Sequence, residues 1–128
     1  MLYILKGDPT PLNRPRFNSN SRKVWDSQKE RKVVSSLDLK YQHGDRPLYE
    51  KALKIECIFY FRIPKTRKNK LKPGDIYYYK SDIDNLLKFI FDVGNKVLYT
   101  DDCLVAEVVA KKLYDDIPRT EMIITEIG

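Results

Sequence analysis

A group of charged side chains in the second half of the chain has the residue types and spacing that could support chemistry. Asp82 and Asp84 are one residue apart, Lys88 follows one helical turn after Asp84, and an acidic pair, Asp101-Asp102, comes after a short apolar run. Carboxylates held together without a counterion repel, so one must take up a proton or they must share a cation. Oxygen ligands favour Mg²⁺ over zinc, with Mn²⁺ as a substitute.

Phosphodiester cleavage is the chemistry that such a group suits. It needs a nucleophilic water, a neutralised phosphate and a stabilised leaving oxygen, all of which carboxylate-bound divalent ions supply. We therefore predict Asp82, Asp84 and Asp102 as metal ligands and Lys88 as a cation that stabilises developing phosphate charge or orients the water. An alternative stays open, because acids are also common where a helix begins and in turns.

The element that must position these acids is an amphipathic helix at about 82–94. Ser81 can cap it in a capping box with Asp84, and Gly94 is expected to end it. If Asp82 is still extended and Asp84 begins the helix, both carboxylates can point toward one ion. The apolar residues fall on one side and predict the core face: Ile83, Leu86, Leu87, Ile90, Phe91 and Val93.

A basic loop at 64–80 precedes this helix. Residues 65–80 have a net charge of +5, against +6 for the whole chain. The run Tyr77-Tyr78-Tyr79 follows the cations and predicts either stacking on unpaired bases or a strand with one packed face; both can hold, because alternate residues of a strand face opposite ways. A solvated loop is the plainer interpretation. The candidate DNA-binding cations are Lys65, Arg67, Lys68, Lys70, Lys72 and Lys80.

An earlier proline-rich segment adds two more candidate phosphate contacts. Arg14 and Arg16 flank Pro15 and should project from a stiff, extended backbone. A solvated loop is an equal alternative for these two residues, so their assignment depends on the rest of the chain.

The order of elements predicts a single domain over 1–128, of the α/β (α+β type) class. Its sheet should be mixed and largely antiparallel, packed by two main helices at about 26–42 and 82–94. Segments 104–113 and 119–127 are expected to pair as an antiparallel hairpin around a turn at 115–118. The first helix carries apolar residues at helical spacing: Val33, Val34, Leu37 and Tyr41.

Composition excludes several classes. No apolar run is long enough for a transmembrane helix, and residues 1–6 lack the features of a signal peptide, so we expect a cytoplasmic protein that does not associate with membranes. Cys57 and Cys103 lack zinc-type spacing and are expected to be buried thiols. No glycine-rich phosphate-binding motif is present, so no nucleotide cofactor is expected.

The acidic motif resembles that of the RusA-type Holliday junction resolvases, which are crossover junction endodeoxyribonucleases often carried by prophages. The resemblance rests on the segment from Asp82 to Lys88, read as D-x-D-N-L-x-x-K, then Asp92 and the run ending in Asp101-Asp102. It covers about 8–126, and Arg14-Pro15-Arg16-Phe17 adds a weaker likeness. The basic loop is longer than the resemblance leads us to expect, and its three tyrosines are not part of it.

The resemblance implies a small Mg²⁺-dependent homodimer that binds four-way junction DNA and makes paired symmetric nicks in recombination and repair. By position it implies that Asp82, Asp84 and Asp102 are the catalytic acids and Lys88 the catalytic lysine. Two other functions remain: a non-catalytic nucleic-acid-binding module, and a metal nuclease for flap, single-stranded or RNA substrates.

Overall fold

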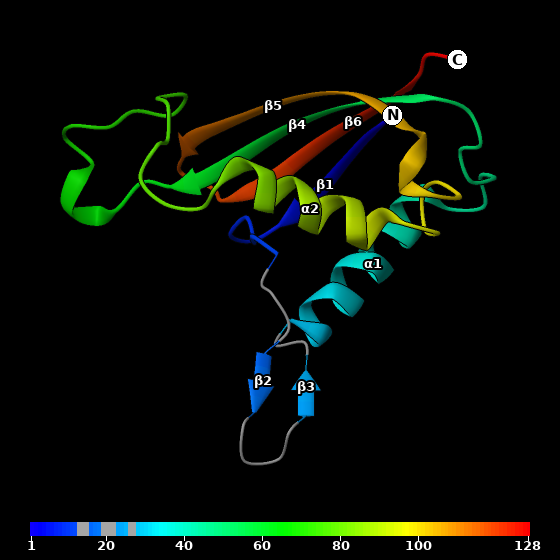
Figure 1. The fold of residues 1–128 in the computed structure, drawn as a ribbon. Coiled ribbons are helices and arrows are strands. Elements are labelled where there is room, and N and C mark those ends of the chain that lie inside the picture. The colour runs from blue at the N-terminus through cyan, green and yellow to red at the C-terminus, as the bar shows by residue number, and fades with distance from the viewer. Residues whose placement is uncertain (13–15, 19–22, 26–27) are drawn as a thin grey trace.

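The protein folds into a four-stranded sheet with two helices packed on one face (Figure 1). The structure is a computed structural model that describes residues 1–12, 16–18, 23–25 and 28–128. The sheet order is β1-β6-β4-β5, antiparallel except for the parallel pair β4–β5. This confirms the predicted α+β class and mixed, largely antiparallel sheet. The strands are β1 (Leu2–Lys6), β4 (Leu53–Arg62), β5 (Val105–Asp115) and β6 (Arg119–Glu126).

The remaining elements surround this sheet. A small hairpin of β2 (Arg16–Asn18) and β3 (Lys23–Trp25) extends away from the main body in Figure 1. The helices are α1 (Lys29–His43) and α2 (Ile83–Gly94), with short 3-10 turns η1 (Lys65–Arg67) and η2 (Asp102–Leu104). Among the described residues, no helix is long and apolar enough to cross a membrane.

The core lies between the sheet and α2. Alternate residues of β4 are buried, as expected for a strand with one covered face, and β6 adds Met122 and Ile124. The predicted core face of α2 is largely correct, although Ile83 is exposed and Phe89 is buried instead. The side chains that α2 contributes to the core are Leu86, Phe89, Ile90 and Val93.

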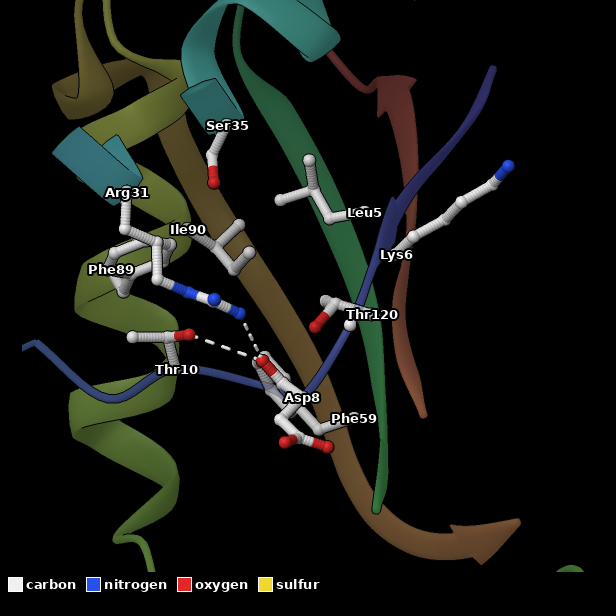
Figure 2. Close-up of a pocket in the computed structure, with 11 residues that line it drawn as sticks. Leu5, Lys6, Asp8, Thr10, Arg31, Ser35, Phe59, Phe89, Ile90 and Thr120 are labelled. Carbon is white, nitrogen blue, oxygen red and sulfur yellow. Dashed lines mark hydrogen bonds between the residues drawn. The ribbon is translucent and has the colours of Figure 1, made fainter. Parts of the chain in front are cut away.

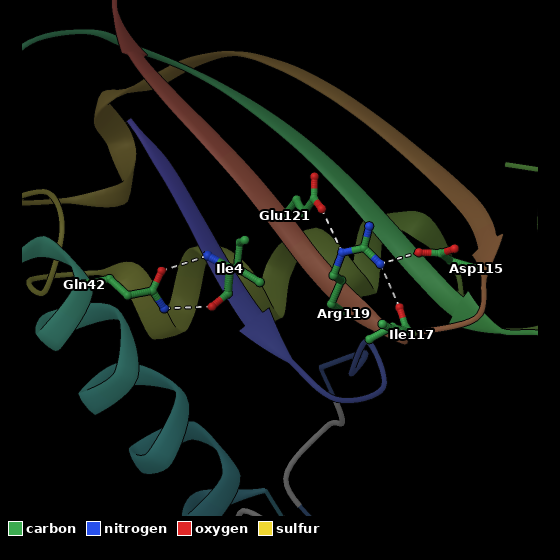
Figure 3. Close-up of polar contacts among 6 residues, drawn as sticks. All are labelled: Ile4, Gln42, Asp115, Ile117, Arg119 and Glu121. Carbon is green, nitrogen blue, oxygen red and sulfur yellow. Dashed lines mark hydrogen bonds and ion pairs between the residues drawn. The ribbon is translucent and has the colours of Figure 1, made fainter. Parts of the chain in front are cut away.

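The predicted hairpin of the last two strands is wrong. β4 lies between β5 and β6 and pairs with both, in parallel with β5 and antiparallel with β6. The turn at 115–118 is present, and Arg119 braces it by contacting Asp115, Glu121 and the Ile117 carbonyl (Figure 3). A turn signal in the sequence is local, however, and does not reveal that a third strand occupies the space between its two arms.

Polar side chains protect the sheet edge formed by β1. The Gln42 amide both accepts from the Ile4 backbone N–H at 2.8 Å and donates to the Ile4 carbonyl at 2.7 Å (Figure 3). It thereby satisfies backbone groups that an open edge strand would offer to another chain.

Helix α1 has apolar residues on both sides. Its buried positions are Leu39 and His43, and the latter contacts the Tyr3 hydroxyl through Nδ1 at 2.7 Å. The four apolar residues noted in the sequence are instead all more than half exposed. Three of them follow one another at steps of three and four: Val34 66%, Leu37 61% and Tyr41 86%. Cys57 is buried as expected, whereas Cys103 is exposed.

The start of α2 differs from the sequence prediction, whereas its end at Gly94 agrees with it. Ser81 has a φ of 64°, and Asp82 takes the cap position, so the Ser81 capping box does not form. Gly94 is the last helical residue, but its role is close packing. A Cβ there would lie 2.8 Å from the Tyr99 hydroxyl oxygen, and Tyr99 is fully buried with that hydroxyl donating to the Phe91 carbonyl.

We expect Gly94→Ala to destabilise the protein by about 1–3 kcal/mol, the usual cost of overpacking. Helix propensity alone predicts the opposite sign, a gain of up to about 1 kcal/mol. Urea unfolding measures the free energy, and Tyr99→Phe is the matched partner because it removes the nearest atom. The two changes should couple favourably in a double-mutant cycle, and simple additivity would contradict the packing argument.

Candidate functional site

The start of α2 presents two of the predicted acids. Asp82 is extended, with φ −65° and ψ 135°, and its carbonyl accepts from the Asn85 and Leu86 backbone N–H groups at 3.1 Å. Asp84 lies in the first helical turn. Both residues are exposed, as the sequence interpretation requires if the two carboxylates are to share a ligand.

Lys88 lies beside Asp84. Its Nζ is 3.8 Å from an Asp84 carboxylate oxygen, and both side chains are more than half exposed. Such a surface pair contributes about 0.3–0.5 kcal/mol, so it does not fix the ammonium. Lys88 can therefore turn toward a phosphate that approaches Asp84. Asp92, two turns beyond Asp84, pairs with Lys32 of α1 at 3.2 Å.

Asp102 lies at the other end of α2. Its backbone N–H donates to the Asn95 side-chain oxygen at 3.1 Å, and Asn95 is the residue that follows the helix. At 1.5 Å of rise per residue, Asp84 and Asn95 are about 17 Å apart along the helix axis. Within the part of the chain that the structure describes, no three His, Cys, Asp or Glu side chains are grouped to hold a metal ion.

The topology explains this separation. Parallel strands need a crossover connection, and α2 provides it between β4 and β5. The helix begins after the carboxyl end of β4, and Asp102 immediately precedes β5, whose start pairs with the start of β4. The acids therefore lie at opposite ends of the same sheet.

The acidic pair before β5 has a divided electrostatic character. The Cys103 backbone N–H donates to Asp101 at 2.9 Å and holds the pKa of that carboxyl below its ordinary value. Partial desolvation, then the neighbouring Asp101 and Asp92, raises the pKa of Asp102. The pKa values of the two carboxyls are therefore shifted in opposite directions.

The basic loop is attached to the end of β5 by backbone hydrogen bonds. The Gly74 N–H donates to the Tyr114 carbonyl, the Tyr114 N–H to the Asp75 carbonyl and the Tyr77 N–H to the Lys112 carbonyl, at 2.8–3.0 Å. The three tyrosines form no strand. In this described segment, the residue before them, Ile76, makes an isolated β-bridge to Leu113. All six predicted cations are exposed: Lys65, Arg67, Lys68, Lys70, Lys72 and Lys80.

The tyrosines of this run face different ways. Tyr77 is stacked on Phe61 with ring centroids 3.8 Å apart and meets Tyr114 edge-on at 5.0 Å. Tyr78 and Tyr79 are exposed by 87% and 75%. One tyrosine therefore holds the loop to the sheet, and the other two are available to a ligand.

The predicted arginines are only partly placed. The segment that leads to them begins beside the acids, because the Leu12 N–H donates to the Asn85 carbonyl at 2.9 Å. The turn after β1 lies upstream of these arginines, and its Asp8 carbonyl accepts from both Thr10 and Arg31 of α1 (Figure 2). This turn lines a cavity of about 20 Å³, which has room for one water. Arg16 belongs to β2, and Arg14 lies outside the described residues.

Lys112 is a residue of this region that the sequence did not indicate. Its Nζ donates to the Ser81 carbonyl at 2.8 Å and lies 5.6 Å from the centroid of the Tyr77 ring. It thus connects the tyrosine run to the residue before Asp82. The sequence predicted that β5 pairs with β6. On that prediction, no feature of the sequence indicated that Lys112 lies next to the acids.

The fold and these side chains define a class: a small α+β domain that presents paired carboxylates beside a cationic loop. The chain belongs to the endodeoxyribonuclease RusA family, whose model matches residues 6–125. It is also 27% identical over 136 residues to the uncharacterized protein YqaN of Bacillus subtilis (strain 168), covering 98% of this chain and 96% of that protein. Family membership makes the chain an endodeoxyribonuclease.

Proposed function

We propose that the protein is a Mg²⁺-dependent, structure-selective nuclease that resolves four-way DNA junctions by paired symmetric nicks. One observation supports this proposal in addition to the family match. Two exposed carboxylates directly follow a loop with six exposed cations, in a chain whose net charge already favours a polyanion. Acids repel DNA, so their place beside a DNA-attracting loop is best explained by a metal ion that they hold.

The chain's own residues fit a magnesium ion at the start of α2. Asp82 and Asp84 are exposed oxygen donors, which is the ligand chemistry that Mg²⁺ prefers, and Mn²⁺ should substitute. When bound, the ion supplies an activated water and neutralises phosphate charge. Lys88 adds a positive charge one turn away, positioned to stabilise charge on the phosphate.

We infer that the third carboxylate comes from a second copy of the chain. Asp102 is exposed, but its backbone is hydrogen-bonded to Asn95, and Asn95 lies about 17 Å from Asp84 along the axis of α2, so Asp102 is too far away to share an ion in the same protomer. In a two-fold dimer, Asp102 of the partner subunit can meet Asp82 and Asp84, and the reverse pairing forms an identical second site. Two equivalent cuts then follow from the symmetry.

The exposed side of α1 is the surface that we assign to this dimer. Val34, Leu37 and Tyr41 follow at steps of three and four, which is the spacing of the seam between two packed helices. A second copy presents the same row, so two α1 helices related by a two-fold axis can bury both rows against each other.

A nicking assay on a synthetic four-way junction tests the proposal. With Mg²⁺, we expect symmetric paired cuts on the junction and none on a linear duplex of the same sequence. Asp84→Asn should reduce nicking on the order of a hundredfold or more, since even indirect metal partners contribute ten- to a hundredfold, while junction binding is retained through the loop cations.

Two results would overturn the assignment. Tight, salt-sensitive junction binding without cuts under any divalent ion would indicate a binding module in which the acids only begin a helix. Cuts that favour flaps, single strands or RNA over junctions would indicate a metal nuclease of different selectivity.

A further inference from the structure

A second ligand site lies between the basic loop and the exposed tyrosines. It is a cavity of about 430 Å³, within the range of small-ligand pockets of roughly 300–1,000 Å³. Its lining combines aromatic and aliphatic side chains with one arginine. The lining residues on which the argument depends are Arg67, Leu71, Ile76, Tyr78, Tyr79 and Tyr114.

The backbone around this cavity is held in place before any ligand arrives. The Arg67 N–H donates to the Pro64 carbonyl and the Leu71 N–H to the Arg67 carbonyl, which closes one side of the loop. On the other side, the hydrogen bonds to Tyr114 and the stacking of Tyr77 on Phe61 fix the tyrosine run. A site whose backbone is already ordered loses less conformational freedom on binding than one built on a mobile loop.

The chemistry of the lining selects one kind of occupant. Large apolar side chains remain exposed here, namely Ile76 by 70% and Tyr78 by 87%, and they offer flat surfaces for stacking. Two cations lie near them: Arg67 is part of the lining, and Lys80 Nζ is 5.3 Å from the Tyr79 ring centroid. An aromatic surface next to cations suits a planar base that carries a phosphate.

We propose that this cavity binds one unstacked nucleobase of the DNA strand whose phosphate lies at Asp82 and Asp84. The proposal rests on the nuclease function proposed above. Tyr79 precedes Asp82 by three residues, a reach of at most about 10 Å, so a base held here lies close to the phosphate at the carboxylates. A paired base in continuous duplex enters only if it is unpaired and unstacked, which costs more than for a base at a branch point. The cavity therefore favours branched or single-stranded DNA over duplex.

Fluorescence of 2-aminopurine tests this site. The probe replaces one base, either at the centre of a four-way junction or in the middle of one arm. Each junction is then titrated with the non-cleaving Asp84→Asn protein. We expect the fluorescence to change for the central position only. Adding Tyr78→Ala should abolish that change and weaken junction binding by about five- to 150-fold, the value of one stacked base.

Matched variants separate stacking from other causes. Tyr78→Phe keeps the ring and should behave like the parent protein, and Asn69→Ala, an exposed position of the same loop outside the lining, should have no effect. Duplex affinity and the thermal unfolding midpoint should be unchanged by Tyr78→Ala. An equal loss of duplex binding, or no loss on the junction, would refute base binding.

The result is also distinguishable from failure of the proposed function. If the protein binds a base through Tyr78 but cuts no DNA, the base-binding site is supported and the proposed junction nuclease activity is rejected. If Tyr78→Ala does not change junction nicking and no fluorescence change is seen, the nuclease activity is supported and the base-binding site is rejected.

Discussion

Mixing two inactive variants should restore nicking. Asp82→Asn and Asp102→Asn are each expected to lose on the order of a hundredfold or more of the Mg²⁺-dependent rate, because each removes a metal ligand. If one site uses Asp82 and Asp84 with the partner's Asp102, a mixed dimer contains one intact site and one site that lacks both residues. Random pairing then restores about one quarter of the wild-type sites.

The products of the mixed dimer are equally informative. A dimer with one working site cuts one strand, so nicked junctions should accumulate in place of the two separated duplexes. The measurement is denaturing and native electrophoresis of the same reaction, using the two variants co-expressed with different affinity tags.

A second mixture provides the matched control. Asp82→Asn and Asp84→Asn change the same side of the proposed site, so every mixed dimer retains a defect in both sites and should stay inactive. Rescue of this pair, or failure of the first pair in a dimer proven to be mixed, would exclude a site shared between subunits.

Replacing Leu37 by Asp should separate the subunits and remove nicking. Leu37 lies in the middle of the exposed row on α1 and is 61% exposed, so the change should alter the stability of a single chain by no more than about 0.5 kcal/mol. In a dimer built on this row, two carboxylates would be buried opposite each other without a counterion, at a cost of several kcal/mol.

Light scattering measures the mass, and the nicking assay measures the loss of activity. Lys40→Gln is the matched control, because it changes the net charge by the same one unit at an exposed position of α1 outside the row. It should leave a dimer with normal activity. A Leu37→Asp protein that remains dimeric and active would move the interface to another surface.

The individual elements were readable from the sequence because their signals are local. The alternation of β4, the apolar side of α2 and the extended Asp82 before it all depend on neighbouring residues, and the structure has them nearly as expected. The acidic motif also identified the family, because the spacing of a short motif in the sequence does not depend on how the strands pair.

The relation between elements was not readable in the same way. Nothing near β5 reveals that it pairs in parallel with β4, and this one pairing decides that Asp102 lies far from Asp84. In the same way, the apolar spacing of α1 does not show that one row would remain exposed. Both outcomes depend on contacts between distant segments. Arg14, whose role was predicted from the same kind of local pattern, stays a prediction.

The place of β6 in the sheet has a consequence for synthesis. β6 follows the other described strands in chain order, yet it is an interior strand between β1 and β4, so those two strands do not pair until β6 is inserted. A nascent chain therefore already carries every acid of the candidate site while its sheet is still incomplete. Folding must wait for long-range pairing of the first and last strands. An unfinished chain that ends before Arg119 is therefore expected to carry the acids without a completed core, because Met122 and Ile124 are missing from it.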